Sequence, residues 1–427
     1  MQKRTYRTTN HLAAASAGLG LLATTGLTVH AQATTDSPTI SDLAKQNQAL
    51  LQRLDTLEDL VKKEGLVPGP TATNLVSAMS KMTISGFVQA SYFYDTRRPA
   101  NGAIDGYLWN TKDNSFSLNK FKLTVASEPV ASDKWDAGYR ASLLFGDDAP
   151  DLNTGGASGS GANTSFNDLR EAYVELNVPI GTGLDIKAGE LISLLNWESG
   201  DGGAANPNFS QGNQWWFTGD GPSAGIQGTY NFTDKLGLTL RVDNGLFQGP
   251  VDVNSGKNLS ASLAYKPTKD LWVNLIGWYE SASGGSGSDI SGVSTIGGFQ
   301  VTEKLGTGWE VDYFNFDSDA AASDMWSIGG WIWYDFTAKV DLALRADFVE
   351  NCNGLLGPAV RPGAGLPFST DSSGNLGSVT LTLNYKPVPN IKIQPEVRYD
   401  YTSYSGGLET DGKKDRIIVG CGVSYLF

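Results

Sequence analysis

The sequence contains only two histidines and two cysteines in 427 residues, and this scarcity excludes several kinds of chemistry. Both histidines, His11 and His30, lie near the N-terminus, in a segment that has the features of a cleaved leader. The rest of the chain therefore lacks the residues for a Ser–His triad, a Cys–His dyad or a His-ligated zinc site. No pair of carboxylates is set apart by its spacing either. We expect no catalytic residue, no metal site and no cofactor.

The two cysteines, Cys352 and Cys421, could pair in an oxidising compartment. However, Cys421 falls on the apolar side of the last expected strand, whereas Cys352 falls in an expected loop. Because the two side chains would lie in different surroundings, we expect no disulfide.

Long apolar runs and an excess of basic charge are also missing. The chain has 32 Lys and Arg against 45 Asp and Glu, which gives a net charge of −13. This balance argues against nucleic acid as a partner, because phosphate binding needs a basic face. After residue 33, no stretch is apolar enough for a membrane-spanning helix. A secreted chain of this kind is either soluble outside the cytoplasm or crosses a membrane as a β-barrel.

Residues 1–33 have the composition of a secretory signal peptide. Lys3, Arg4 and Arg7 give a positive start, residues 12–29 are apolar or small, and Ala31-Gln32-Ala33 matches an A-x-A cleavage site. The alternative is an uncleaved membrane anchor. The stretch is rich in Ala, Gly and Thr and only weakly hydrophobic, which favours the cleaved signal peptide.

Residues 34–64 combine a short tail with the periodicity of a coiled-coil helix. Its seam residues are spaced three and four apart: Ile40, Leu43, Asn47, Leu50, Leu54, Leu57 and Val61. Written as heptads, they occupy the a and d positions, where Asn47 would fix the register at a cost in stability. The alternative is a single amphipathic helix that packs on the following domain. Residues 65–82, which include Pro68-Gly69-Pro70, form a stiff linker.

From residue 83 onward the chain consists of strand-like segments separated by turn signals. About sixteen segments can be recognised: 83–95, 115–127, 134–146, 166–178, 183–191, 222–232, 235–244, 259–267, 270–280, 292–303, 308–316, 326–336, 339–350, 377–387, 391–401 and 416–427. Many of them alternate, as where Leu342 and Leu344 oppose Asp341 and Arg345. An even number of alternating strands is typical of a single-chain membrane barrel. We predict an all-β fold, a transmembrane antiparallel β-barrel over residues 83–427, preceded by a short periplasmic coiled-coil helix.

The last segment shows the alternation clearly. Phe427, Tyr425 and Val423 share one apolar side, while the other side carries smaller and more polar residues. A membrane barrel must close on its final strand, and an aromatic terminus suits the membrane interface. Tyr425 and Phe427 also resemble the C-terminal signature of bacterial outer-membrane proteins, which implies recognition by the barrel assembly machinery.

The connections between the segments alternate in length. Tight turns at 231–236, 265–270, 302–308, 335–340 and 385–390 are separated by long polar or Gly-rich stretches, such as 147–165, 191–220 and 351–375. Outer-membrane barrels have short periplasmic turns and long external loops. An even strand number then places both termini in the periplasm. A soluble β-sandwich or propeller is the structural alternative, but it does not require this alternation.

Several segments resemble the OmpL-like family of β-barrel porins of Gram-negative bacteria. The resemblance covers nearly everything from residue 83 to 427 and is carried by ISGFVQASYFYD, LREAYVELNVP, LDIKAGEL, TYNFTDKLGLTLRVDNG, LSASLAYKPTKDLWVN, LALRADF and VTLTLNYKPVPNIKIQPEVRYDY. It implies a pore-forming barrel in the outer membrane, and it does not identify the solute.

Strand alternation places a set of charged and polar side chains on the inner face of such a barrel. We expect the wall of the lumen to include Gln89, Lys120, Lys122, Arg140, Glu171, Glu175, Lys187, Arg241, Arg345, Asp347, Glu396 and Arg398. Taken singly, each could be a solvated charge without a further role, and a shift of one residue would turn a whole strand over. Together they predict an aqueous channel rather than a packed core.

The longest connection, residues 191–220, carries acids and aromatics together: Trp197, Glu198, Asp201, Trp215 and Trp216. In the porins that it resembles by position, the third external loop folds inward and narrows the channel. Loop acids facing Arg and Lys on the wall would set up a transverse field and a weak preference for cations. Neutralising Glu198 and Asp201 is then expected to lower the cation-to-anion permeability ratio. The tryptophans could stack on sugars, pack the loop or mark the membrane interface.

Two classes of function remain open at this point. The first is passive diffusion of small hydrophilic solutes or ions across the outer membrane, with a sugar-selective channel as a narrower form. The second is a structural anchor whose coiled coil ties the outer membrane to the cell wall. Outer-membrane lipid and other copies of the same chain are the expected partners. Resemblance to sixteen-stranded porins implies a trimer, although Leu at every d position with a buried Asn favours two strands.

Overall fold

The computed structural model describes residues 81–104, 110–129, 133–153, 168–219, 221–246, 250–251, 255–281, 289–317, 323–351, 374–408 and 412–427, together with the isolated residues 48, 52, 53 and 56. The chain divides into two compact units, Met1–Met82 and Thr83–Phe427. In the first unit, Gln48, Gln52, Arg53 and Thr56 are helical. The predicted signal peptide, the seven heptad residues, Cys352 and the side chain of Trp216 lie outside the described residues. No helix within those ranges is both long enough and apolar enough to cross a membrane.

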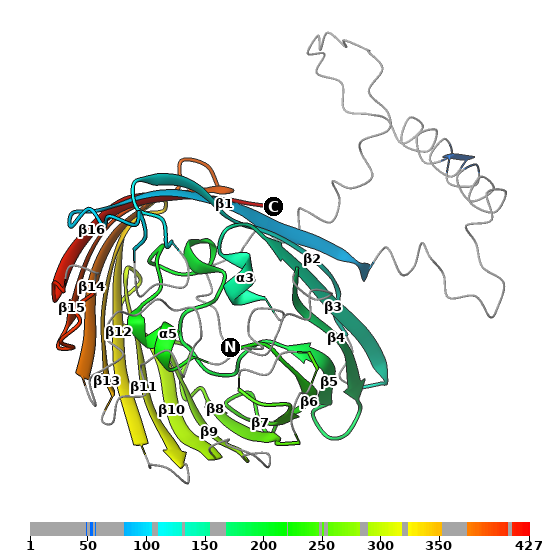
Figure 1. The fold of residues 1–427 in the computed structure, drawn as a ribbon. Coiled ribbons are helices and arrows are strands. Elements are labelled where there is room, and N and C mark those ends of the chain that lie inside the picture. The colour runs from blue at the N-terminus through cyan, green and yellow to red at the C-terminus, as the bar shows by residue number, and fades with distance from the viewer. Residues whose placement is uncertain are drawn as a thin grey trace. The chain divides into compact units, whose positions relative to one another are not determined.

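The second unit is a closed antiparallel barrel with sixteen strands in the described part of the chain (Figure 1). Every strand pairs with its sequence neighbours, and β1 pairs with β16 to close the barrel. The strands are β1 (Thr83–Asp95), β2 (Ser115–Ser127), β3 (Asp136–Phe145), β4 (Leu169–Val178), β5 (Leu184–Leu191), β6 (Ser223–Asn231), β7 (Leu236–Asp243), β8 (Asn258–Tyr265), β9 (Leu271–Glu280), β10 (Asp289–Gln300), β11 (Leu305–Asp317), β12 (Ser323–Thr337), β13 (Val340–Asn351), β14 (Gly374–Tyr385), β15 (Ile391–Thr402) and β16 (Asp415–Leu426). The predicted barrel is confirmed, and the predicted strand ends differ from these by at most three residues.

Alternation along each strand separates an apolar outer face from an inner face that is mainly polar. On β16, Val423 and Tyr425 expose 41% and 48% of their surface on the outside, whereas Arg416 and Ser424 are buried inside. Cys421 belongs to the outer face and is a free thiol. A closed barrel leaves no strand edge unpaired, so lipid needs to meet only side chains.

Four of the tight turns are built on the same local motif. Thr233, Thr268, Thr302 and Thr337 each accept hydrogen bonds through the side-chain oxygen from the main-chain N–H groups two and three residues later, at 3.0–3.3 Å. A threonine hydroxyl that binds the backbone in this way stabilises a tight reversal of the chain. The repeated pattern of Thr, two largely charged residues and an aliphatic residue in the sequence therefore marks one end of the barrel, here called the turn end.

The opposite end, here called the loop end, has eight connections, and six of them are long. They span residues 96–114, 146–168, 192–222, 244–257, 352–373 and 403–414, while 281–288 and 318–322 are as short as turns. The predicted alternation of lengths therefore has two exceptions. The described short helices lie in two of these connections: α3 (Ala149–Leu152) in 146–168, and η2 (Gly202–Ala204) with α5 (Asn213–Phe217) in 192–222. Figure 1 shows α3 and α5 inside the ring of strands.

Candidate functional site in the barrel interior

The connection 192–222, here called the inward loop, folds into the barrel and lies against one part of its wall. Its helix α5 contacts β12, β13 and β14, and η2 contacts β1 and β16. Most of its described residues from 195 to 219 are buried. The predicted inward-folding connection thus fills part of the interior next to β1 and β12–β16.

Wall carboxylates hold the backbone of the inward loop by accepting its N–H groups. Glu310 on β11 accepts from Trp197 N at 2.8 Å, and Asp347 on β13 accepts from Gln214 N at 3.0 Å. Glu396 on β15 accepts from Phe209 N at 2.8 Å. Each bond satisfies a buried donor that a loop cannot pair within itself, so these acids replace the ladder that a strand would provide.

Wall cations hold the loop from its carbonyl side. Arg345 and Arg398 donate to the carbonyls of Ser210 and Gln211, and Lys392 Nζ donates to the Gly203 carbonyl at 2.8 Å. Wall acids therefore accept hydrogen bonds from main-chain N–H groups of the loop, and wall cations donate hydrogen bonds to its main-chain carbonyls. The loop is fixed along its length and not merely at its ends.

Glu198 and Asp201 of the inward loop form direct ion pairs with the wall. Glu198 Oε1 lies 2.9 Å from Arg345 Nη1, and both side chains are fully buried. Asp201 Oδ1 lies 2.9 Å from Lys122 Nζ, with about a tenth of each side chain exposed. The loop acids were expected to face wall cations, and they do, but the two groups are in direct contact and not separated by an open channel. Because a buried charge is costly without its partner, each pair ties the loop to the wall.

A further chain of buried charges runs from β1 to β15. Arg416 lies 3.1 Å from Asp400 and 3.9 Å from Asp95, and Arg398 lies 2.7 Å from Asp400. None of these side chains exposes more than 2% of its surface. The arginines here are neutralised by adjacent carboxylates, so they contribute little free charge to the lumen.

Connection 146–168 is held to the wall by a separate ion pair. Asp148 lies 3.4 Å from Lys120 on β2 and accepts a hydrogen bond from Asn110 N at 3.1 Å. Burial raises the pKa of the Asp148 carboxyl above its ordinary value, while the attraction of Lys120 opposes that rise. The pair fixes the start of α3 next to β2.

The structure divides the predicted wall residues into two groups. Those beneath or beside the connections are nearly completely buried: Gln89, Lys120, Lys122, Glu171, Arg241, Arg345, Asp347, Glu396 and Arg398. Arg140, Glu175 and Lys187 keep between 11% and 24% of their side chains exposed. All of them lie on the inner face, because each shares the parity of its strand's other inward residues.

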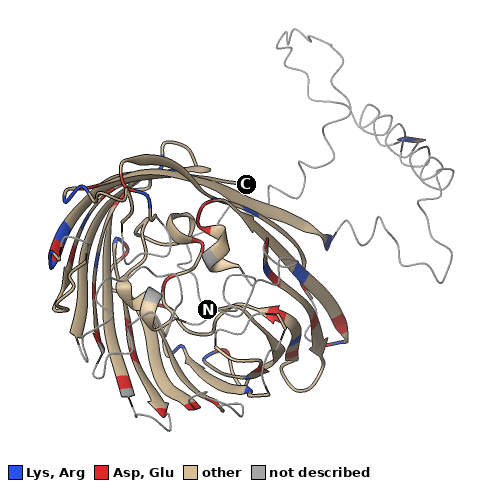
Figure 2. Ribbon diagram, viewed as in Figure 1, with Lys and Arg blue, Asp and Glu red and all other residues tan. Residues whose placement is uncertain are grey.

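The partly exposed group lies on β3, β4 and β5, here called the β3–β5 cluster. Arg140 contacts Glu171 at 2.9 Å, and Lys187 lies 3.3 Å from Glu175 and 3.8 Å from Asp185. Lys187 also lies over the ring of Tyr173, 5.1 Å from its centroid. Figure 2 shows charges of both signs along the barrel strands. Asp185 and Tyr173 were not predicted, although each lies two residues from a predicted wall position.

Two tryptophans of the inward loop, Trp197 and Trp215, are used in packing. Trp197 stacks on Trp331 at 4.5 Å between ring centroids, with Trp333 at 5.9 Å, and Trp215 Nε1 donates to the Glu198 carbonyl at 2.8 Å. A Cβ on Gly308 would lie 2.3 Å from the Trp197 ring, so only glycine leaves room there. Trp331 and Trp333 went unpredicted, although their W-x-W spacing puts both on one strand face.

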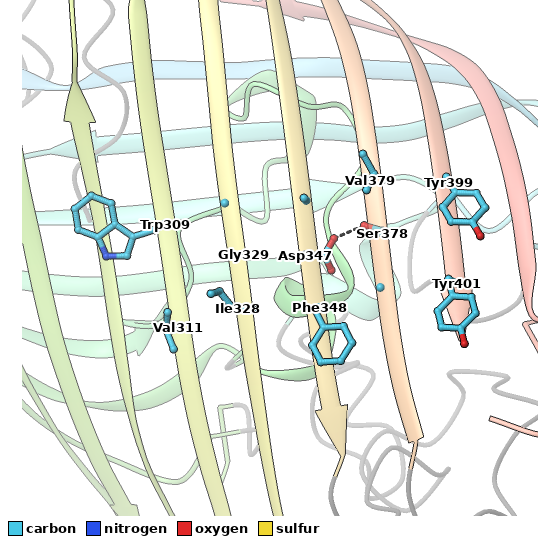
Figure 3. Close-up of a pocket in the computed structure, with 13 residues that line it drawn as sticks. Trp309, Val311, Ile328, Gly329, Asp347, Phe348, Ser378, Val379, Tyr399 and Tyr401 are labelled. Atoms are coloured by element: carbon cyan, nitrogen blue, oxygen red, sulfur yellow. Dashed lines mark hydrogen bonds between the residues drawn. The ribbon is translucent and has the colours of Figure 1, made fainter. Parts of the chain in front are cut away.

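A shallow apolar hollow of about 710 Å³ lies on the outer face of β11–β15 (Figure 3). Its outward side chains are Trp309, Val311, Ile328, Phe348, Val379, Tyr399 and Tyr401. Asp347 and Ser378, which also border it, are hydrogen-bonded to one another from the inner-face positions. This hollow belongs to the apolar outer face of the barrel and not to its interior. Among the described residues, no group of three or more His, Cys, Asp or Glu could hold a metal ion.

Comparison with solved structures shows the same fold at low sequence identity. An anion-selective porin from Comamonas acidovorans is 12% identical, with a TM-score of 0.53 over 81% of this chain and 99% of that chain. OmpT, an outer membrane protein of Vibrio cholerae, is 11% identical, with a TM-score of 0.51 over 81% and 97%. The outer membrane channel DcaP of Acinetobacter baumannii is 14% identical, with a TM-score of 0.50 over 81% and 97%.

The sequence matches no curated protein. A family model does match, over residues 81–427, and it covers the whole barrel. Its description is "Putative beta-barrel porin-2, OmpL-like". The closed barrel, its apolar exterior and its charged interior agree with that match, and the chain belongs to this family of OmpL-like β-barrel porins.

Proposed function

We propose that the protein is an outer-membrane porin through which small hydrophilic solutes and ions diffuse passively. The observation that carries the proposal is the inner face, where most strands carry charged or other polar side chains, while the outer face is apolar. Buried ion pairs and hydrogen bonds fix the inward loop against one part of the wall. A polar interior of this kind suits water and solutes.

The route for solutes is proposed to run beside the β3–β5 cluster. There the inward-facing Arg140, Asp185 and Lys187 keep 24–33% of their side chains exposed, whereas the wall beneath the inward loop is buried. Burial of Trp215 and stacking of Trp197 on Trp331 leave these loop rings little free face for a sugar. The geometry therefore favours general diffusion over sugar stacking.

Planar lipid bilayers test the proposal directly. The refolded full-length protein is expected to produce discrete conductance steps in potassium chloride, and liposomes that contain it should swell in small neutral solutes. Protein that is folded, as judged by its heat-modifiable migration, yet gives neither signal would favour the anchor.

Ion selectivity is proposed to depend on the β3–β5 cluster. Replacing Glu175 with Gln and Asp185 with Asn leaves Lys187 without its two acidic partners, so the reversal potential in a salt gradient should move towards anions. Lys187→Gln should move it towards cations, which makes it the matched control.

The loop acids offer a second comparison. Glu198→Gln with Asp201→Asn should change selectivity less, because each acid already neutralises a wall cation in contact. A larger change from the loop pair would return selectivity to the inward loop, as the sequence alone suggests.

The N-terminal residues are proposed to act in the periplasm. Both ends of the barrel, Thr83 and Phe427, belong to the turn end, which is the periplasmic end in outer-membrane barrels. Residues 1–33 would be removed, 34–64 would form a coiled coil and 65–82 a linker. The coiled coil and the barrel walls would hold a trimer, and cell wall could be the ligand of the helix.

Replacing Leu50 and Leu54 with Asp is expected to weaken the oligomer without preventing barrel folding, because charge in the a/d seam opposes association. Chemical crosslinking of detergent-extracted protein should give three bands for the native chain and mainly one for the variant. Substitution of the exposed Gln52 and Arg53 by Asp is the control. A native ladder that stops at one or two bands contradicts the trimer.

A further inference from the structure

The loop end of the barrel carries opposite charges on two of its sides. Where β1, β2 and β16 reach this end, the described residues include five exposed cations, here called the basic patch: Arg97, Arg98, Lys112, Lys413 and Lys414. Around β10–β12, in contrast, connections 281–288 and 318–322 contain no Lys or Arg, and the strand ends beside them carry Asp289, Asp317 and Asp324. The basic patch is therefore a local exception in a chain whose net charge is −13.

Arg98 of the basic patch is held on the outer face of β1 by a hydrogen bond. Its Nε donates to the hydroxyl of Tyr94 at 2.6 Å, and Tyr94 points outward, because it alternates with the buried Phe93 and Asp95. The two Nη groups of Arg98 have no partner among the described residues. A guanidinium fixed through Nε presents its remaining N–H donors as a planar fork, and this fork matches the oxygens of a phosphate group.

Arg97 adds a second cation at the seam between β1 and β16. Its Nε donates to the Asp415 carbonyl at 2.9 Å, and its Nη2 contacts the Asp415 carboxylate. The two side chains keep 34% and 45% of their surface exposed, so the pair remains open to a further ligand.

The opposite wall offers a direct comparison. β9 is eight strands from β1 in the closed ring, and its outward Tyr279 donates to Asp289 at 2.6 Å. A tyrosine hydroxyl at the loop end is thus paired with a cation on β1 and with an acid near β9. An anionic ligand would be attracted to the first side and repelled by the second.

The outer face of β1, β2 and β16 next to the basic patch is strongly apolar. Phe116 exposes 88% of its surface, more than any other large apolar residue in the described part of the chain, and its ring lies 4.8 Å from that of Tyr92. Leu118, Ile417 and Val419 expose 43–57% on the same face. A surface of this kind suits acyl chains, and cations just beyond it suit the level of the headgroups.

We propose that the basic patch binds the phosphate groups of an anionic lipid in the outer leaflet of the membrane. Arg98 is the principal contact, Arg97 supports it, and the acyl chains lie over Phe116 and Tyr92. The inference rests on the proposed outer-membrane placement, in which the loop end faces outward. It adds a lipid partner of defined chemistry and assigns that partner to one side of the barrel.

Native mass spectrometry of the purified full-length protein in detergent tests the site. The probe is lipid A, a phosphorylated glycolipid, compared with the same lipid after enzymatic removal of its phosphates. The native chain is expected to retain the phosphorylated form, and Arg97→Gln with Arg98→Gln should lower that retention by about tenfold. Lys269→Gln is the matched control, since the Lys269 side chain is 89% exposed at the turn end.

Heat-modifiable migration first confirms that each variant is folded. If the double variant does not fold, Arg98→Gln alone leaves the Arg97–Asp415 pair intact and should lower retention by about fivefold. Arg98→Lys keeps the charge but not the fork, so it should restore only part of the loss.

Several results would overturn the site: equal retention of the two lipids, equal retention by the native chain and Arg98→Gln, or an equal loss in Lys269→Gln. Displacement of lipid A by an equal concentration of inorganic phosphate would assign the patch to free phosphate and overturn the lipid. Retention does not depend on conductance. Protein that retains lipid A but never conducts would therefore contradict the channel and keep this site, whereas protein that conducts without retaining lipid A would contradict the site alone.

Discussion

Replacing Arg345 with Met is expected to lower the free energy of unfolding by about 3–5 kcal/mol, the usual cost of removing one partner from a buried ion pair. Glu198 would remain buried with Gly212 N at 2.8 Å and Trp331 Nε1 at 3.3 Å as its donors. Arg345 also donates to the Ser210 carbonyl, so the inward loop loses two attachments to β13. Denaturant unfolding in detergent, followed by tryptophan fluorescence, measures the change.

Two further variants distinguish the buried charge from ordinary loss of contact. Adding Glu198→Gln to Arg345→Met should recover part of the stability, because Glu198 then leaves no uncompensated charge. Recovery should be incomplete, since Asp347, 3.7 Å from Arg345 Nε, still loses its cation. Arg97→Met is the matched control, since its pair with Asp415 is about a third to a half exposed and should contribute below about 1 kcal/mol. A double variant that is less stable than Arg345→Met, or equal losses in Arg345→Met and Arg97→Met, would contradict this account.

The barrel could be predicted from the sequence because every strand has one face in an apolar medium and the other in a polar one. Lipid outside and a polar interior inside impose a period of two that persists in strands as different as β2 and β16. The four threonine turns add a local signal at four of the reversals. Both kinds of information are contained in a few adjacent residues, so neither depends on knowing the distant contacts.

The contacts of the inward loop could not be predicted in the same way. Glu198 and Arg345 are 147 positions apart, and nothing in either neighbourhood specifies the other. The sequence indicated opposite charges on loop and wall, but whether they meet or face each other across water depends on how deeply the loop folds.

The parity rule also fails to describe the loop end. Phe314 and Val349 lie on the inner face although they are apolar, because loops cover them and remove them from water. The alternation of apolar and polar residues along a strand reflects what surrounds each face. At the loop end, the inner face is surrounded by loops of the same chain and not by water. Apolar residues at inward strand positions in the sequence therefore indicate that loops fold inward and cover them.

Deleting Phe427 is expected to reduce the protein in the outer membrane to a small fraction of the native amount while changing the stability of folded barrels modestly. Phe427 exchanges two main-chain hydrogen bonds with Gly86, at 2.9 and 3.0 Å, and its ring is 45% exposed near Phe121. Two such bonds contribute about 1–3 kcal/mol. A loss of that size cannot unfold a barrel closed by the whole β1–β16 ladder, so a large loss of surface protein must arise during assembly.

Comparison of assembly in cells with refolding in vitro separates the two effects. The deletion variant should refold into detergent or lipid nearly as well as the native chain, yet accumulate in the periplasm as aggregated or degraded material. Phe427→Tyr keeps an aromatic ring at the membrane interface and should restore surface levels. Normal surface levels of the deletion would show that the terminal residue is incidental. A matching failure to refold in vitro would instead place its importance in the closure of the barrel, because the Gly86 contacts are then needed before the ladder can form.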